Sequence, residues 1–99
     1  DYGRVRSVLS GKRAMKAIAF TSIAFHEYNE WFETNDKMIG RIKVLIRDIE
    51  RDSFKGIGKP EPLRGNWAGY WSRRIDNEHR LVYKVTDAQI LIVKCKGHY

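Results

Sequence analysis

The chain has 99 residues, of which 42% are hydrophobic and 31% are charged. This length suits one domain with a single modest core, and the composition is typical of a globular protein and not of a disordered one. No apolar run approaches the roughly 18 residues that a membrane span needs, and no signal peptide is expected. Cys95 is the only cysteine, which excludes an internal disulfide and favours a cytoplasmic setting.

The net charge of +7 is concentrated in the C-terminal half. Residues 55–99 carry nine Lys and Arg against four Asp and Glu, whereas residues 15–54 are nearly balanced. Such a field attracts a polyanion, although charge alone is explained equally well by a solvated surface that aids solubility. Residues 1–14 are small, polar and basic, and we interpret them as an extension or a cloning remnant ahead of a single domain that spans residues 15–99.

The N-terminal half predicts a strand followed by a helical hairpin. A short strand is expected over residues 16–20, and Thr21 or Ser22 can cap a helix that runs to about Glu33. The buried face of this helix is expected to carry Ala24, Tyr28, Trp31 and Phe32. After a turn at residues 34–36, a second helix is predicted because apolar residues recur at helical spacing. They are Met38, Ile39, Ile42, Leu45, Ile46 and Ile49.

The C-terminal half predicts an ordered loop followed by three strands. The loop is rich in Gly and Pro, which exclude a helix or a central strand. It is expected over residues 54–63, with strands over 67–75, 80–85 and 89–96 and turns at 76–78 and 86–87. This order predicts an α+β fold in which an N-terminal strand and a two-helix hairpin accompany a mainly antiparallel sheet. The hairpin would cover one face of the sheet, and the other face would be open to a ligand.

Glu61 stands between two prolines in the predicted loop. Proline restricts the backbone on both sides, so the carboxylate would be held at low entropic cost. Taken alone, this pattern favours a rigid turn whose glutamate faces water.

Arginines lie on two neighbouring predicted strands, at Arg73, Arg74 and Arg80. If residues 76–78 form a three-residue loop, Arg74 lies directly opposite Arg80, where like charges repel. A scissile phosphate would complete such a site, because arginine offers planar bidentate donors and a permanent charge. The alternative is that the two arginines pair separately with Asp76, Glu78 or Glu61.

The chain ends in His98 and Tyr99, directly after an apolar strand that would anchor them. Histidine suits proton transfer near neutral pH, and a tyrosine can stack on an RNA base. A terminal histidine can also be a frayed end without a role. The histidines and Cys95 show no metal-ligand spacing, so no metal site is expected.

Four segments of the chain carry a specific pattern. They are GKPEPL at 58–63, GYWSRRI at 69–75, EHRLVY at 78–83 and HY at 98–99. At this spacing they resemble the YoeB family of bacterial toxin ribonucleases, within the larger RelE/ParE toxin group. The resemblance runs from Met15 to the last residue. It implies cleavage of messenger RNA in the ribosomal A site without a metal or cofactor, by attack of the 2′-hydroxyl on the adjacent phosphorus.

The resemblance also implies roles for single residues. Glu61 matches the general base and His98 the general acid, while Arg80, helped by Arg74, would hold charge on the phosphoryl oxygens. Tyr99 would position the nucleotide. RNA-backbone contacts are expected at Lys59, Arg64 and Arg73.

The implied partners are messenger RNA, ribosomal RNA and a cognate antitoxin of the YefM/Phd type whose tail covers the site, with a possible homodimer and no membrane. The chain departs from the family pattern at Gly65, where some members carry histidine, and at Lys96-Gly97 before the terminal pair. Two other function classes stay open. One is a basic module that docks on ribosomal RNA without cutting, and the other is a ParE-like inhibitor of a topoisomerase.

Overall fold

The structure is a computed structural model that describes residues 16–99. The interpretation of residues 1–14 therefore lies outside the described residues. In chain order the elements are β1 (Ala17–Phe20), α2 (Ser22–Thr34), α3 (Lys37–Arg51), β2 (Glu61–Pro62), the 3₁₀ turn η1 (Gly65–Trp67), β3 (Trp71–Arg74), β4 (Arg80–Val85) and β5 (Gln89–Lys94).

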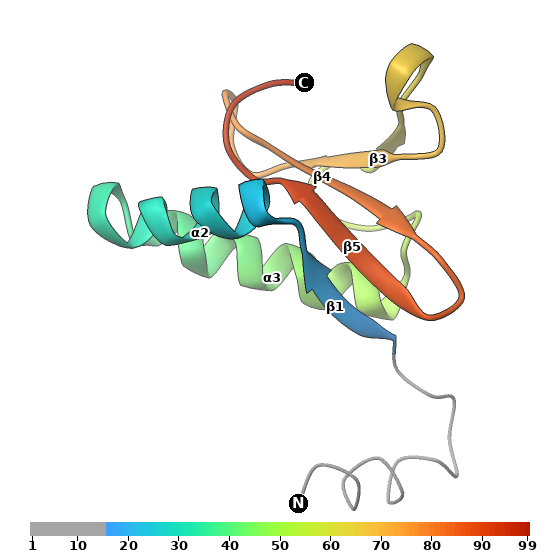
Figure 1. Ribbon diagram of the computed structural model, residues 1–99, viewed down its shortest axis with the longest axis horizontal. Helices are drawn as coiled ribbons and strands as arrows, with labels where there is room; N and C mark the ends of the chain where they lie inside the picture. Colours follow the sequence, from blue (N-terminus) through green and yellow to red (C-terminus); the bar gives the residue numbers. More distant parts are fainter. Residues whose placement is uncertain (1–15) are drawn as a thin grey trace, which may run out of the picture.

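The strands form one sheet in the order β1-β5-β4-β3-β2. All neighbours are antiparallel except β1, which runs parallel to β5. Figure 1 shows α2 and α3 side by side against one face of this sheet, and neither helix covers the other face. The predicted α+β fold is confirmed, including the mainly antiparallel sheet. Within residues 16–99 neither α-helix covers the second face of this sheet, which carries Arg74 and Arg80 and is named the helix-free face.

The helical hairpin follows from capping and apolar spacing. Thr21 caps α2, which begins at Ser22, because its hydroxyl accepts a hydrogen bond from the Ala24 N–H at 3.2 Å. Along α3 the predicted apolar stripe is buried at Met38, Ile39, Ile42, Leu45 and Ile49. Its sixth member, Ile46, is half-buried and packs against the core. The expectation that Phe32 is buried is wrong, because it is 54% exposed. It lies roughly 100° around the helix from the buried Trp31 and packs instead on the ring of Tyr28.

Two boundaries in the β2–β3 region differ from the prediction. The expected strand over residues 67–75 is shortened to β3, because the residues before it form η1 and then turn at Gly69, whose φ is +92°. The expected loop over residues 54–63 contains the two-residue strand β2, which pairs with the edge of β3.

The strand expected over residues 89–96 ends at Lys94. The N–H of Cys95 leaves the sheet ladder and donates to the carboxylate of Glu27 on α2, at 2.8 Å. Cys95 itself is fully buried in the core, as expected of a small core residue. No helix within residues 16–99 is long and apolar enough to cross a membrane.

Candidate functional site

The helix-free face of the sheet brings Glu61, Arg74 and Arg80 together. In the strand register, Arg74 lies directly opposite Arg80, and this confirms the expectation drawn from the three-residue turn. Glu61 lies opposite Ser72 on the next strand. Because side chains alternate along a strand, Ser72 and Arg74 share a face. Residues that lie opposite one another on this face form a row across the strands, so that Arg74 and Arg80 make one row and Glu61 and Ser72 the next. Glu61 is therefore diagonal to Arg74.

The two arginines have different surroundings. Arg74 is exposed, and within residues 16–99 neither arginine makes an ion pair with a carboxylate. Arg80 is only 9% exposed. Its guanidinium donates through Nη1 to the carbonyls of Asp76, Asn77 and His79 at 3.0, 3.3 and 3.2 Å. Backbone oxygens thus hold Arg80 without cancelling its charge, which contradicts the alternative of separate ion pairs with acidic residues.

The segment before Glu61 is held against β3. The carbonyl of Gly58 accepts a hydrogen bond from the N–H of Arg74. Lys59 follows with a φ of +52°, a left-handed conformation that is rare for a non-glycine residue and more so before a proline. Strained backbone of this kind concentrates at functional sites. Lys59 is exposed and directly follows Gly58, whose carbonyl is bonded to the backbone of Arg74.

Arg73 lies on the opposite face, under the helices, and is fully buried. Its Nε donates to the Tyr83 hydroxyl, and its two terminal nitrogens donate to the Asp48 carboxylate and to three backbone carbonyls, those of Asp52, Lys55 and Ile57. All five N–H donors of the guanidinium are used. The expectation that Arg73 binds RNA is therefore wrong. Arg73 instead fixes the loop that leads to Lys59 and Glu61.

Arg73, Asp48 and the loop carbonyls that Arg73 binds are called the Arg73 clamp. The pKa of Asp48 in this clamp is lowered, so its ionised form is strongly favoured. Burial raises its pKa, but hydrogen bonds from the Ile57 N–H and from Arg51 and Arg73 outweigh burial and lower the pKa to about 2. The ion pair with Arg73 is therefore present across the neutral range.

The C-terminal tail is tied to the start of β4. The N–H of Gly97 donates to Nδ1 of His79 at 2.7 Å, and the carbonyl of Gly97 accepts from the N–H of Arg80 at 3.0 Å. Gly97 has a φ of +75°, a conformation that glycine adopts without strain. In Figure 1 the C-terminus accordingly lies beside the turn between β3 and β4. His98, which is exposed, follows directly and is thereby brought to the Arg80 end of the sheet.

His79, which holds the tail, was not predicted as a functional residue. Its ring also packs edge-on against Trp31, with 4.8 Å between centroids. The only available signal was its place beside Arg80 in the segment EHRLVY.

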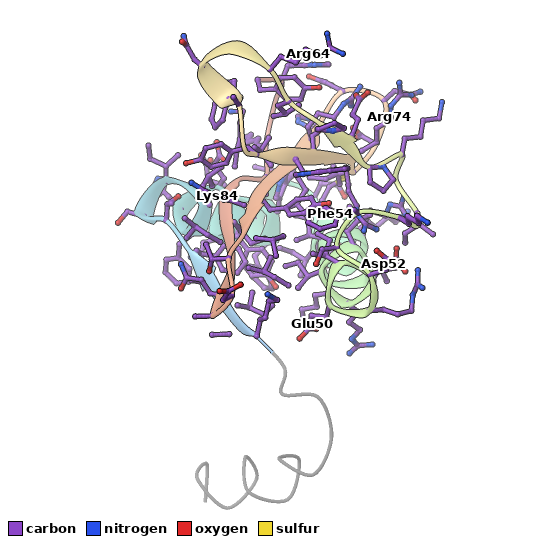
Figure 2. All side chains as sticks on the ribbon, turned by 90° about the vertical axis from the view of Figure 1, so that its right-hand side faces the viewer. Glu50, Asp52, Phe54, Arg64, Arg74 and Lys84 are labelled. Atoms are coloured by element: carbon purple, nitrogen blue, oxygen red, sulfur yellow. The ribbon has the colours of Figure 1, made fainter. Side chains whose placement is uncertain are left out.

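The remaining expected RNA contact, Arg64, is exposed just before η1. Figure 2 shows Arg64 and Arg74 in the same upper part of the molecule, away from the end of α3 where Glu50 and Asp52 lie. Within residues 16–99, no three His, Cys, Asp or Glu side chains are grouped so as to hold a metal ion.

A family profile described as the YoeB-like toxin of bacterial type II toxin–antitoxin systems matches residues 20–99. The chain belongs to the YoeB-like toxins. Among curated YoeB-like proteins, the toxin YoeB of Synechocystis sp. is 57% identical over 83 residues, which are 83% of this chain and 95% of that protein. The toxin RelK of Mycobacterium tuberculosis is 47% identical over 85 residues, covering 86% of this chain and all of that protein. The resemblance seen in the sequence is confirmed.

Solved structures of YoeB-like toxins agree with this fold. The YoeB dimer of Staphylococcus aureus has a TM-score of 0.81 and 46% identity, and covers 87% of this chain and 100% of that one. The heterotetrameric YoeB–YefM toxin–antitoxin complex of the same organism has a TM-score of 0.79 at 46% identity, with the same coverage. YafQ of Escherichia coli is only 18% identical but has a TM-score of 0.72 over 84% of this chain and 93% of that one, which shows a likeness of fold alone.

Proposed function

We propose that this chain is a toxin ribonuclease that cuts messenger RNA in the ribosomal A site, acting in the cytoplasm. The observation that carries this proposal is the arginine row, Arg74 opposite Arg80, with Glu61 one row away on the helix-free face. Two facing cations that form no ion pair with a carboxylate of residues 16–99 favour a bound anion. A carboxylate beside them opposes simple RNA binding unless it takes part in the chemistry.

In the proposed reaction, the 2′-hydroxyl of one nucleotide attacks the adjacent phosphorus. Glu61 takes the 2′-proton, the bond between phosphorus and the 5′-oxygen breaks, and His98 donates a proton to the departing oxygen. The products are a 2′,3′-cyclic phosphate and a free 5′-hydroxyl. Each proton transfer contributes roughly 10²–10⁴-fold to the rate of such reactions.

Arg74 and Arg80 would stabilise the negative charge that grows on the phosphoryl oxygens. Donors of this kind contribute on the order of 10²–10³-fold each. Because Arg80 is already fixed by the carbonyls of the β3–β4 turn, its charge needs no reorganisation when the substrate arrives. Lys59 and Arg64 would bind the flanking RNA backbone, and Tyr99 would position a nucleotide.

The test is to incubate the full chain with translating ribosomes and to map new RNA 5′ ends. We expect cuts in messenger RNA with the wild type and with Lys43→Met, an exposed lysine on α3 that serves as the control. We expect about 10²-fold or more slower cutting with Glu61→Gln and with His98→Gln. Cutting that survives both substitutions would contradict the acid–base roles. Ribosome binding without any cutting would favour a binding module, and inhibition of a topoisomerase instead would favour a ParE-like toxin.

We also propose that an antitoxin of the YefM type inhibits this chain. The S. aureus YoeB–YefM complex contains a toxin 46% identical to this chain. Arg74 and Arg80 form no ion pair within the described part of the chain, and they suit an acidic segment of such a partner. Addition of a YefM-type antitoxin should abolish the mapped cuts, and this antitoxin should bind the Arg74→Met variant more weakly than the wild type. A stable complex that still cuts RNA would contradict this. Light scattering of the free chain tests for a homodimer like that of S. aureus YoeB.

A further inference from the structure

The helix-free face continues past Glu61 to a third row of side chains. The N–H of Leu63 donates to the carbonyl of Tyr70 at 2.9 Å, so the pairing of β2 with β3 extends one step beyond Pro62. Tyr70 precedes Ser72 by two residues and therefore shares its face. One step beyond the paired Trp71 and Tyr83, the register places Tyr70 opposite Lys84.

Tyr70 and Lys84 do meet on this face. The Lys84 ammonium lies 5.4 Å from the centre of the Tyr70 ring, within the range of a cation–π interaction. Lys84 is exposed and within residues 16–99 makes no ion pair with a carboxylate. In Figure 2 it lies well apart from Glu50 and Asp52 at the end of α3.

Trp67, at the end of η1, packs against this third row. Its ring meets the Tyr70 ring edge-on, with 5.4 Å between centroids and 89° between planes. Backbone hydrogen bonds in and after η1, from Trp67 N–H to the Arg64 carbonyl and from Tyr70 N–H to the Trp67 carbonyl, hold both rings in a tight turn. Both rings are half-buried, and neither belongs to the core between sheet and helices in the described chain. They are thus a fixed aromatic surface without a core role.

We propose that Tyr70, Trp67 and Lys84 form a second nucleotide subsite for single-stranded RNA, next to the cleavage site. The proposal rests on the ribonuclease function proposed above. Successive rows on one face of a sheet are about 7 Å apart, so this row is one step from Glu61 and two from the arginine row. A base would stack on the aromatic rings, and Lys84 would bind the phosphate of the same nucleotide. Stacking on aromatic side chains tolerates any base, so the subsite would bind without reading sequence.

The test distinguishes the contribution of base stacking to RNA binding from the contribution of the phosphate contact. The full chain carrying Glu61→Gln, which is expected to cut about 10²-fold or more slowly than the wild type, is titrated with a short oligoribonucleotide and with a ribose-phosphate chain of the same length that lacks bases. In this background Tyr70→Leu should weaken binding of the oligoribonucleotide about tenfold and leave binding of the base-free chain unchanged. Lys84→Met should weaken both and lower the slope of log affinity against log salt by about 1.

Two control variants have the same types of substitution, aromatic to leucine and lysine to methionine, at residues outside the helix-free face. Phe25→Leu alters an exposed aromatic residue on α2, and Lys43→Met an exposed lysine on α3. Both should bind like the parent. Circular dichroism checks that each variant is folded; if Tyr70→Leu is not, Lys84→Met decides, because its exposed side chain can be removed without opening the core.

Three results would overturn the subsite. The first is a parent chain without measurable affinity for the oligoribonucleotide at low salt. In the second, Tyr70→Leu or Lys84→Met weakens oligoribonucleotide binding no more than its control does, while Arg74→Met still weakens it. This result would leave the proposed cleavage site intact. The third is an equal loss for both ligands with Tyr70→Leu. Failure of the proposed ribonuclease function would give a different result, because the wild type would then make no cuts in messenger RNA on ribosomes.

Discussion

The imidazole of His79 accepts a hydrogen bond through Nδ1 from the backbone N–H of Gly97, at 2.7 Å. This contact joins the turn before β4 to the last residues of the chain. The neighbouring bond from the Arg80 N–H to the Gly97 carbonyl closes the attachment from the other side. The side chain proposed as the general acid is thus positioned by a histidine that need not touch the substrate.

The first prediction concerns His79 as this positioning residue. His79→Leu leaves the Gly97 N–H without its acceptor, a loss of about 1–3 kcal/mol, and we expect kcat for messenger RNA cleavage to fall about tenfold. His79→Asn places an amide oxygen close to the position of Nδ1 and should retain most of the activity. Both variants lose the edge-on packing against Trp31, so the comparison isolates the acceptor.

The supporting measurement is hydrogen exchange at the Gly97 amide. We expect faster exchange in His79→Leu and nearly wild-type exchange in His79→Asn. Equal activities in the two variants would show that the acceptor does not position His98.

Part of this site could be predicted from the sequence because it depends on contacts between residues close together in the chain. The three-residue turn alone sets Arg74 opposite Arg80. Side-chain alternation also turns Arg73 to the face opposite Arg74, but the RNA contact expected of Arg73 was wrong because the structure buries that face under the helices. What Arg73 binds there could not be predicted, because Asp48 is 25 residues away on a helix and no local pattern links them. The partnership of His79 with Gly97 likewise requires the path of the tail. The two-residue β2 exists only through its pairing with β3.

The second prediction compares the two arginines that bind Asp48. Arg73→Met removes a fully buried guanidinium and frees three carbonyls of the loop before Lys59, so we expect the free energy of unfolding to fall by about 3–5 kcal/mol. Arg51→Met removes an arginine whose side chain is 63% exposed, and the expected loss is below about 1 kcal/mol. Urea unfolding of both variants measures the difference. Similar losses of unfolding free energy in the two variants would contradict a special structural role of Arg73.

The third prediction concerns acid stability. The pKa of Asp48 is lowered from 3.8 to about 2 in the folded chain. A carboxyl with a lowered folded pKa contributes stability that is fully present above the unfolded pKa and is lost as the pH falls through the folded pKa. The difference in free energy of unfolding between wild type and Asp48→Asn should therefore be largest above about pH 4 and shrink toward pH 2. Urea titrations across this range test it, and a difference that does not change with pH would exclude this origin.

The fourth prediction concerns the strained backbone of Lys59. Its φ of +52° costs roughly 1–2 kcal/mol for a residue with a Cβ, whereas glycine adopts it freely but gives up about 0.4–1 kcal/mol through the unfolded chain. Lys59→Gly should therefore leave the free energy of unfolding unchanged or raise it by up to about 1.6 kcal/mol. Lys59→Met keeps the strain and should match the wild type in urea unfolding.

Both Lys59 variants lose the same charge beside Arg74. We expect each to weaken RNA binding and to lower the slope of log affinity against log salt by about 1, as loss of one phosphate contact does. Lys59→Gly would then be at least as stable as the wild type and yet less active, because the strain is kept for the position of the lysine and not for the fold. A clearly destabilised Lys59→Gly, or a Lys59→Met with unchanged RNA affinity, would refute that explanation.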